Sequence, residues 1–199
     1  MEEGYVKFKA NWEKSPALPL RFIKQLNHWR NILYTLNLIG ADKDEIGFGN
    51  ISQRFGKSNH FIISGSATGK LETLKPDHYS LVTEIDMDHN KLHCSGPILA
   101  SSESMSHGTI YRECKGINGV IHVHDKRLWN KLLHKVPTTS KKAAYGTPEM
   151  AYEIIRLIHE TNAIEKKIIV MEGHEEGIFT FGTSLDEAGE ILLDNYREF

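Results

Sequence analysis

The sequence has few cysteines, no block of positive charge and no long apolar run. Cys94 and Cys114 are too few for a disulfide framework, so a reducing cytoplasm is the simplest location. The formal net charge is −2 and no cluster of lysine and arginine stands out, which argues against nucleic acid as a main partner. The longest apolar runs have the length of a strand and the N-terminal residues 1–4 are acidic, so we expect neither a signal peptide nor a transmembrane helix.

Histidine, by contrast, is abundant, with 11 residues in the chain. His122 and His124 lie in the segment 119–124, which is β-branched and apolar and therefore predicts a strand. Because side chains alternate along a strand, both imidazoles should share one face, with Ile121 and Val123 packed on the other. Such a pair is half of a metal site, although two surface histidines on the polar side of a half-buried strand fit the local pattern equally well.

The length of 199 residues fits a single domain with a core of its own. Residues 1–19, which Pro16 and Pro19 interrupt, predict an N-terminal arm, and residues 20–199 predict the domain. Helices are expected at 20–39, 102–113, 126–134, 148–161 and after Ser184, where Ser184 and Glu187 form a capping-box motif. Strands are expected at 46–55, 60–64, 79–85, 91–94, 119–124, 168–171 and 177–181. Strands outnumber helices without strict alternation, which favours a mixed, largely antiparallel sheet with helices on its faces.

A third candidate metal ligand is His174, which follows the apolar segment 168–171 in a loop with glycines on both sides. Three neutral imidazoles with one open position suit a catalytic Zn²⁺ or a similar divalent ion. An ordinary loop histidine is the alternative interpretation.

The sequence Ser101-Ser102-Glu103 precedes a predicted helix. Ordinary capping explains it, because serine suits the N-cap and a carboxylate is favoured in the first turn. In the functional alternative Glu103 is a base facing a metal-bound substrate, while the serine hydroxyls and the helix N-terminus bind an anion. His107 lies one turn further on the same face, where it could orient Glu103 or have a structural role.

Two glycine-containing loops match no nucleotide-binding motif. The loop 65–70 has three residues between its glycines and Leu71 after its lysine, whereas a P-loop needs four residues and then serine or threonine. The sequence Gly47-Phe48-Gly49 lacks the third glycine of a dinucleotide fingerprint and precedes a strand. The sequence is compatible with either an anion-binding nest or a tight turn at each of these loops.

Taken in order, these motifs resemble the class II aldolase/adducin family, which includes L-fuculose-phosphate and L-rhamnulose-phosphate aldolases and L-ribulose-phosphate 4-epimerase. The resemblance extends from about Leu20 to the C-terminus. It rests on Gly49-Asn50-Ile51-Ser52, Thr68-Gly69 with Leu74-Lys75-Pro76, Ser101-Ser102-Glu103 with His107, His122-Val123-His124, Tyr145-Gly146-Thr147-Pro148-Glu149-Met150-Ala151, and His174 before Gly177-Ile178-Phe179-Thr180-Phe181-Gly182.

The resemblance implies a three-layer α/β/α sandwich with a mixed, mostly antiparallel central sheet. It implies that His122, His124 and His174 hold a divalent metal, usually Zn²⁺, with Mn²⁺, Fe²⁺, Co²⁺ or Ni²⁺ as alternatives. Glu103 would act beside the metal as base or as a fourth ligand in the resting state. The residues implied to contact a substrate phosphate are Asn50, Thr68, Gly69, Ser101 and Ser102.

The function implied by the resemblance is that of a metal-dependent lyase. Its substrate would be a small phosphorylated sugar or related hydroxy-carbonyl compound, which reacts through a metal-stabilised enediolate while Glu103 moves a proton. A sugar-phosphate dehydratase or epimerase is an alternative on the same scaffold. A non-catalytic adducin-like module is disfavoured, because all three histidines and Glu103 are present. Family members are commonly homotetramers with sites at subunit interfaces, and we expect no membrane partner.

Three features depart from the family pattern. The segment 136–142 lacks the tyrosine acid that the sugar-phosphate aldolases supply across a subunit interface, and Tyr145 belongs to another motif. The usual His-Gly is replaced by His174-Glu175-Glu176-Gly177, which predicts two further carboxylates near the metal. We also expect no catalytic C-terminal tail, because the sequence stops at Phe199.

Overall fold

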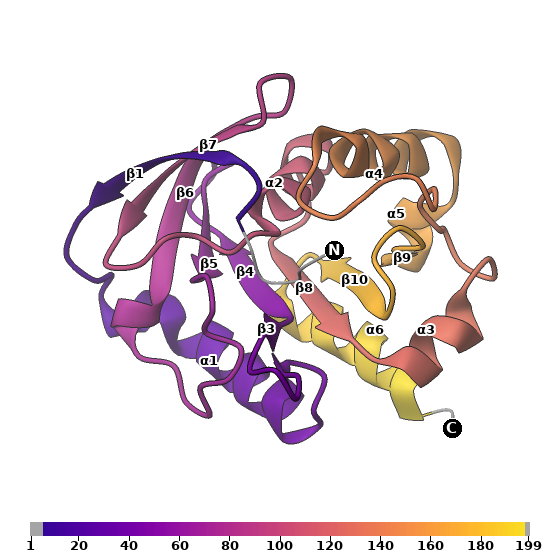
Figure 1. The fold of residues 1–199 in the computed structure, drawn as a ribbon, viewed down its shortest axis with the longest axis horizontal. Coiled ribbons are helices and arrows are strands. Elements are labelled where there is room, and N and C mark those ends of the chain that lie inside the picture. Colours follow the sequence, from indigo (N-terminus) through magenta and orange to yellow (C-terminus); the bar gives the residue numbers. More distant parts are fainter. Residues whose placement is uncertain (1–5, 198–199) are drawn as a thin grey trace.

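The computed structural model describes residues 6–197, which form a large eight-stranded sheet between two layers of helices (Figure 1). The strand order is β1-β7-β6-β5-β4-β8-β10-β9, and every neighbouring pair is antiparallel except β1 with β7. The predicted fold class, an α/β/α sandwich with a mixed, mostly antiparallel central sheet, is confirmed. No helix within residues 6–197 is long and apolar enough to cross a membrane.

The strands of the large sheet are β1 (Lys9–Lys14), β4 (Asn50–Arg54), β5 (Phe61–Ser64), β6 (Tyr79–Asp86), β7 (Lys91–Gly96), β8 (Gly119–His124), β9 (Ile168–Val170) and β10 (Gly177–Gly182). A small second sheet pairs β2 (Gly40–Ala41) with β3 (Gly47–Phe48). The helices are α1 (Leu20–Thr35), α2 (Ser104–Glu113), α3 (Lys126–Leu132), α4 (Pro148–Glu160), α5 (Ala163–Lys166) and α6 (Leu185–Arg197), with a 3₁₀ turn, η1, at Pro76–His78.

Alternation along the strands divides the core between the two faces of the sheet. On β8, Val120 packs in the core beneath α2 and α4, whereas Ile121 and Val123 pack in the core beneath α1 and α6. Each such fully buried side chain contributes on the order of 1.5–3 kcal/mol of transfer free energy. The same alternation turns His122 and His124 toward the α2 and α4 side, so the prediction that they share one face opposite Ile121 and Val123 is confirmed.

Helix α1 ends at Thr35, four residues before the predicted end. The reason is Asn37, which adopts a left-handed conformation with φ of 56° and allows Leu38 N–H to donate to Leu33 O at 2.9 Å. Asparagine is one of the few residues that tolerate this conformation after a helix, so the chain turns here instead of continuing to Gly40.

The predicted strand over residues 46–55 is divided at Gly49. This glycine has a φ of +73°, and a Cβ atom there would lie 2.7 Å from Ile39 Cγ1, so the backbone turns where only glycine fits. The turn separates β3 from β4 and places Asn50 at the start of β4.

Part of the predicted N-terminal arm belongs to the sheet, because Lys9–Lys14 forms β1 and pairs in parallel with β7. The acidic residues 1–4 lie outside the described residues. At the start of α6, Ser184 Oγ accepts from Glu187 N–H at 3.1 Å, as the capping box predicts. The Glu187 carboxylate instead accepts from Thr183 N–H at 2.6 Å.

Candidate metal centre and anion site

Two imidazoles of β8 meet on the side of the sheet that carries α2 and α4. His122 and His124 are both buried, and their Nε2 atoms lie 3.1 Å apart. Asn50 of β4 is the register partner of His122, and Gly177 of β10 is the partner of His124, so neighbouring strands hold both positions. The burial of the two rings excludes the alternative of two surface histidines.

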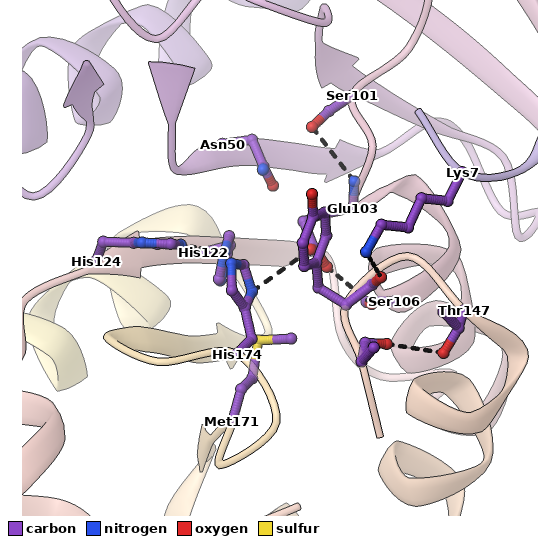
Figure 2. Close-up of polar contacts among 12 residues, drawn as sticks. Lys7, Asn50, Ser101, Glu103, Ser106, His122, His124, Thr147, Met171 and His174 are labelled. Atoms are coloured by element: carbon purple, nitrogen blue, oxygen red, sulfur yellow. Dashed lines mark hydrogen bonds and ion pairs between the residues drawn. The ribbon is translucent and has the colours of Figure 1, made fainter. Parts of the chain in front are cut away.

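His174 completes the cluster from the loop between β9 and β10. Its N–H donates to Met171 O at 3.3 Å and its carbonyl accepts from Gly177 N–H at 2.9 Å, so a tight turn holds it. One ring nitrogen from each histidine lies within 4.8 Å of the others. A Cβ atom on Gly177 would come within 3.2 Å of His174 Nδ1, which explains the absence of a side chain there. Figure 2 shows His122, His124 and His174 gathered beside Glu103.

The hydrogen bonds of His122 fix its tautomer. Its Nδ1 donates to Ile178 O at 3.2 Å, which leaves the lone pair of Nε2 on the side of His124. Burial, together with His124 and His174, holds the pKa of His122 well below its ordinary value, so the ring is neutral. A neutral imidazole whose second nitrogen is tied to a carbonyl is the state in which histidine binds metals. The donor set therefore fits a divalent ion of the Zn²⁺ type.

Glu103 lies at the N-cap of α2, next to His174. Its side chain is buried, Oε1 is 3.6 Å from His174 Nδ1, and Oε2 accepts a hydrogen bond from Ser106 Oγ at 3.0 Å. Helix capping does not explain this carboxylate, because it accepts no cap hydrogen bond within the described part of the chain. The hydroxyl that accepts from Glu103 N–H, at 3.4 Å, is that of Ser101.

His107 does not orient Glu103. Its Nε2 lies 2.6 Å from Asn50 Oδ1 and its Nδ1 lies 2.6 Å from Ser52 Oγ, so both ring nitrogens are directed at β4. The hypothesis that His107 positions Glu103 is therefore wrong, and the residue with that contact is Ser106.

The residues predicted to contact phosphate border the same cavity as the histidines and Glu103. They are Asn50, Thr68, Gly69, Ser101 and Ser102. The two loops left open by the sequence, at residues 47–49 and 65–69, form its walls. A Cβ atom on Gly69 would lie 2.3 Å from Gly40 O, so glycine is required where these loops meet.

A buried arginine supports the Thr68-Gly69 turn. Arg30 is 1% exposed, and its Nη2 donates to Thr68 O at 3.3 Å and to Gly69 O at 2.8 Å. Its Nη1 donates to Glu72 O at 2.6 Å. Because the C=O and N–H of a trans peptide point in opposite directions, the Gly69 N–H points away from the guanidinium. Among the residues described, no carboxylate pairs with Arg30, so its positive charge lies close to the turn.

Two aromatic rings beside the histidine cluster were not identified from the sequence. Tyr145 is stacked on His174, with centroids 4.5 Å apart, and Phe48 is stacked on His124, with centroids 5.4 Å apart. Both rings border the cavity. Tyr145 belongs to the Tyr-Gly-Thr-Pro motif and Phe48 to the Gly47-Phe48-Gly49 sequence, so both lie in segments that the sequence singled out. Neither motif predicts that the ring stacks on a histidine.

Lys7 is a further neighbour that the sequence did not reveal. Its Nζ lies 3.5 Å from the centroid of the Tyr145 ring and donates to Tyr145 O at 3.2 Å. Burial lowers the pKa of Lys7, and the charge of Glu103 acts in the opposite direction. A lysine in a predicted arm has no local pattern that would assign it to this centre.

The structure resolves two of the departures from the family pattern. Glu175 does not lie near the cluster, because it forms an exposed ion pair with Lys126 at 3.1 Å. Within residues 6–197, the residues that border the cavity include neither Glu175 nor Glu176, so the prediction of two added carboxylates there is wrong. A φ of 70° at Glu176 turns the loop at this point.

The segment 136–142 follows the edge of the sheet instead of reaching the cavity. Val170 N–H donates to Pro137 O at 2.9 Å, and Thr139 N–H donates to Val170 O at 3.0 Å. In the described part of the chain, the cavity is bordered by no residue of this segment. Tyr145 supplies the tyrosine that does border it.

The sandwich and the buried histidine cluster define an α/β/α protein whose centre is positioned for a metal. Residues 34–193 match the family described as Class II Aldolase and Adducin N-terminal domain. The chain therefore belongs to this class II aldolase and adducin family, as its sequence motifs predicted.

Solved structures share the fold. An L-fuculose-1-phosphate aldolase from Thermus thermophilus is 22% identical, with a TM-score of 0.57 over 89% of this chain and 95% of that chain. Another L-fuculose 1-phosphate aldolase is 18% identical, with a TM-score of 0.68 over 92% of this chain and 84% of that chain. A sugar-phosphate aldolase from Thermotoga maritima is 16% identical, with a TM-score of 0.62 over 87% of this chain and 94% of that chain. No curated protein sequence matches the chain significantly.

Proposed function

We propose that this protein is a metal-dependent lyase that acts on a small phosphorylated sugar or a related hydroxy-carbonyl compound. The observation that carries the proposal is that three buried imidazoles, the Glu103 carboxylate and a group of hydroxyl, amide and backbone N–H donors border one cavity. Membership of the class II aldolase and adducin family supports it.

The proposed metal ligands are His122, His124 and His174. Zn²⁺ is the first choice for three imidazoles, with Mn²⁺, Fe²⁺, Co²⁺ or Ni²⁺ as alternatives. When bound, such an ion polarises the carbonyl and hydroxyl oxygens of a substrate.

Glu103 is the proposed base. The hydrogen bond from Ser106 Oγ to Oε2 restricts rotation of the carboxylate, while Oε1 faces the histidine cluster. A carboxylate held in this way can take a proton from a substrate carbon beside the carbonyl and return it. Aldol cleavage, dehydration and epimerisation differ in the bond that breaks, and each can use a base in this place.

The phosphate of the substrate is proposed to bind among the side chains and N–H groups of the loops that border the cavity. Asn50, Ser101 and Ser102 offer side-chain donors, and the Thr68-Gly69 turn offers backbone donors. The positive charge of Arg30 close to this turn favours an anion, because within residues 6–197 no carboxylate compensates the buried guanidinium.

A screen of phosphorylated ketoses and aldehydes with the metal-loaded protein tests the proposal, with both carbon–carbon cleavage and loss of water as readouts. Glu103→Gln should lower the rate by about 100-fold or more, as expected for loss of a general base. Glu113→Gln, at the opposite end of α2, is the matched control and should leave the rate unchanged.

A protein purified without a histidine tag that held no stoichiometric zinc, manganese, iron, cobalt or nickel would overturn the enzyme proposal and favour a non-catalytic adducin-like module. The homotetramer common in the family and the cytoplasmic location stay predictions. Native mass measurement and cell fractionation test them.

A further inference from the structure

A line of four buried polar side chains runs from the cavity into α2. Asn50 Oδ1 lies 2.6 Å from His107 Nε2, and His107 Nδ1 lies 2.6 Å from Ser52 Oγ. Ser52 Oγ in turn lies 2.8 Å from the hydroxyl of Tyr111. The exposed fraction is 6% for Asn50 and 0% for the other three. Of the four, Asn50 alone borders the cavity in the part of the chain described.

The chemistry of these groups sets the direction of each hydrogen bond. The Asn50 oxygen can only accept, so His107 Nε2 carries the hydrogen and donates to it. Burial lowers the pKa of His107 to about 3, and a neutral imidazole has a single N–H. Its Nδ1 must therefore accept from the Ser52 hydroxyl, and Ser52 Oγ accepts from the Tyr111 hydroxyl.

With the hydrogen bonds in these directions, the amide hydrogens of Asn50 are directed at the cavity. No described residue accepts a hydrogen bond from Asn50 Nδ2, while Oδ1 is taken by His107. The reversed amide would present its oxygen to the cavity, and an oxygen acceptor repels a phosphate. The two orientations thus differ by a charge-assisted hydrogen bond to the ligand.

We propose that His107 is a positioning residue for the anion site. With Ser52 and Tyr111 behind it, His107 holds the Asn50 amide with its hydrogens toward the cavity, so that the phosphate end of the substrate meets a donor. This inference rests on the proposed function, which supplies the phosphorylated ligand, and adds how the chain prepares one donor for it.

The tautomer of His107 is the first test, because it can be measured on the wild-type protein. In a sample labelled with ¹⁵N-histidine, the His107 ring is assigned by its absence from His107→Phe. The expected result is a hydrogen on Nε2 and none on Nδ1. A hydrogen on Nδ1 would reverse the Asn50 amide and overturn the inference.

The affinity for inorganic phosphate, measured by titration calorimetry, is the second test. Asn50→Ala should weaken phosphate binding about tenfold, as expected for one hydrogen bond to a charged group. His107→Phe and Ser52→Ala should weaken it to a similar degree, because either change allows the reversed amide. Ser52→Thr keeps the hydroxyl and should restore the affinity, and Tyr111→Phe should stay within about threefold of wild type.

The outcomes separate this inference from the proposed function. Phosphate affinity that falls in Asn50→Ala but is unchanged in His107→Phe and Ser52→Ala would overturn the inference alone. A wild-type protein with no measurable phosphate affinity would overturn this inference and the proposed phosphate site, whereas metal content and the lyase screen decide the proposed metal-dependent activity. If His107→Phe does not fold, two measurements still test the inference. One is the tautomer of His107 in the wild-type protein, with the ring assigned by specific labelling, and the other is the phosphate affinity of Ser52→Ala compared with Ser52→Thr. Metal content should be equal in all variants, because none of the four residues belongs to the histidine cluster.

Discussion

The phenol ring of Tyr145 lies stacked on the imidazole of His174, with centroids 4.5 Å apart and ring planes inclined by 26°. Lys7 approaches the same phenol ring, with its Nζ 3.5 Å from the centroid. His174 comes from a loop, unlike the two histidines of β8, so packing on Tyr145 restricts a ring that the sheet does not hold.

Replacement of Tyr145 should therefore change metal affinity through His174. Tyr145→Leu removes the stacked ring and should weaken metal binding about tenfold, the lower end of the effect seen when groups supporting a metal ligand are lost. Tyr145→Phe keeps the ring and should bind metal as the wild type does. Competition with a chelator measures both, and equal affinities for Leu and Phe would contradict a role for the stacked ring.

Loss of one proposed ligand should abolish metal retention. His122→Ala removes one of three imidazoles, and a site left with two holds a divalent ion poorly. Elemental analysis after metal-free purification should find less than stoichiometric metal, with the far-ultraviolet circular dichroism unchanged. His89→Ala, at an exposed histidine, is the control and should keep its metal. Full metal content in His122→Ala would mean that the ligand assignment is wrong.

Stability should fall in mild acid, in part because of His107. Burial lowers its pKa from 6.5 to about 3, so below pH 6.5 the unfolded chain binds a proton that the folded chain does not. The free energy of unfolding then decreases as the pH falls from 6.5 toward 3, and at pH 5 this amounts to about 2 kcal/mol. His122, whose pKa burial also lowers, adds to the loss.

Urea unfolding of metal-free protein at pH 5, 6 and 7 measures this dependence. His107→Phe removes the titrating group, so its stability should fall by about 2 kcal/mol less than that of wild type between pH 7 and pH 5. An identical pH dependence in the two proteins would contradict the assignment of a neutral, buried His107.

Arg30 should be important for stability. Arg30→Met leaves the carbonyls of Gly69 and Glu72 without the Arg30 donor, while Thr68 O keeps its hydrogen bond from Leu71 N–H, and we expect the free energy of unfolding to fall by roughly 3 kcal/mol. Arg30→Lys keeps the charge but loses the forked geometry, so it should recover only part of the difference. Arg156→Met, which removes a half-exposed ion pair with Glu153, should cost less than about 1 kcal/mol. Urea unfolding compares the three, and equal losses in Arg30→Met and Arg156→Met would contradict this role.

The sequence predicts those parts of the centre that depend on strand periodicity. His122 and His124 share a face because of the alternation along β8, and the sheet is recognisable from its apolar strands. Strand β1 was not predicted in this way, because all six of its side chains are exposed and only Ala10 and Trp12 among them are apolar. Its place is set by backbone pairing with β7, which depends on the path of the chain.

Sequence patterns also did not predict the direction of side chains in loops and at helix ends. Periodicity places Glu103 and His107 on one helix face, yet Glu103 contacts Ser106 and His107 contacts β4. Likewise, proximity in sequence put Glu175 near the metal, whereas the turn at Glu176 directs it to Lys126. Such directions follow from tertiary packing, which a local pattern does not contain.

The pairing of β8 with β10 sets His122 opposite Phe179 and His124 opposite Gly177. A slip of this pairing by one residue would turn both imidazoles to the face that carries α1 and α6, away from His174. Metal binding would then depend on the strand register, because the three nitrogens come together only when β8 and β10 pair in the native alignment. A chelator-sensitive refolding yield would thus show whether the ion selects the native alignment while the sheet forms.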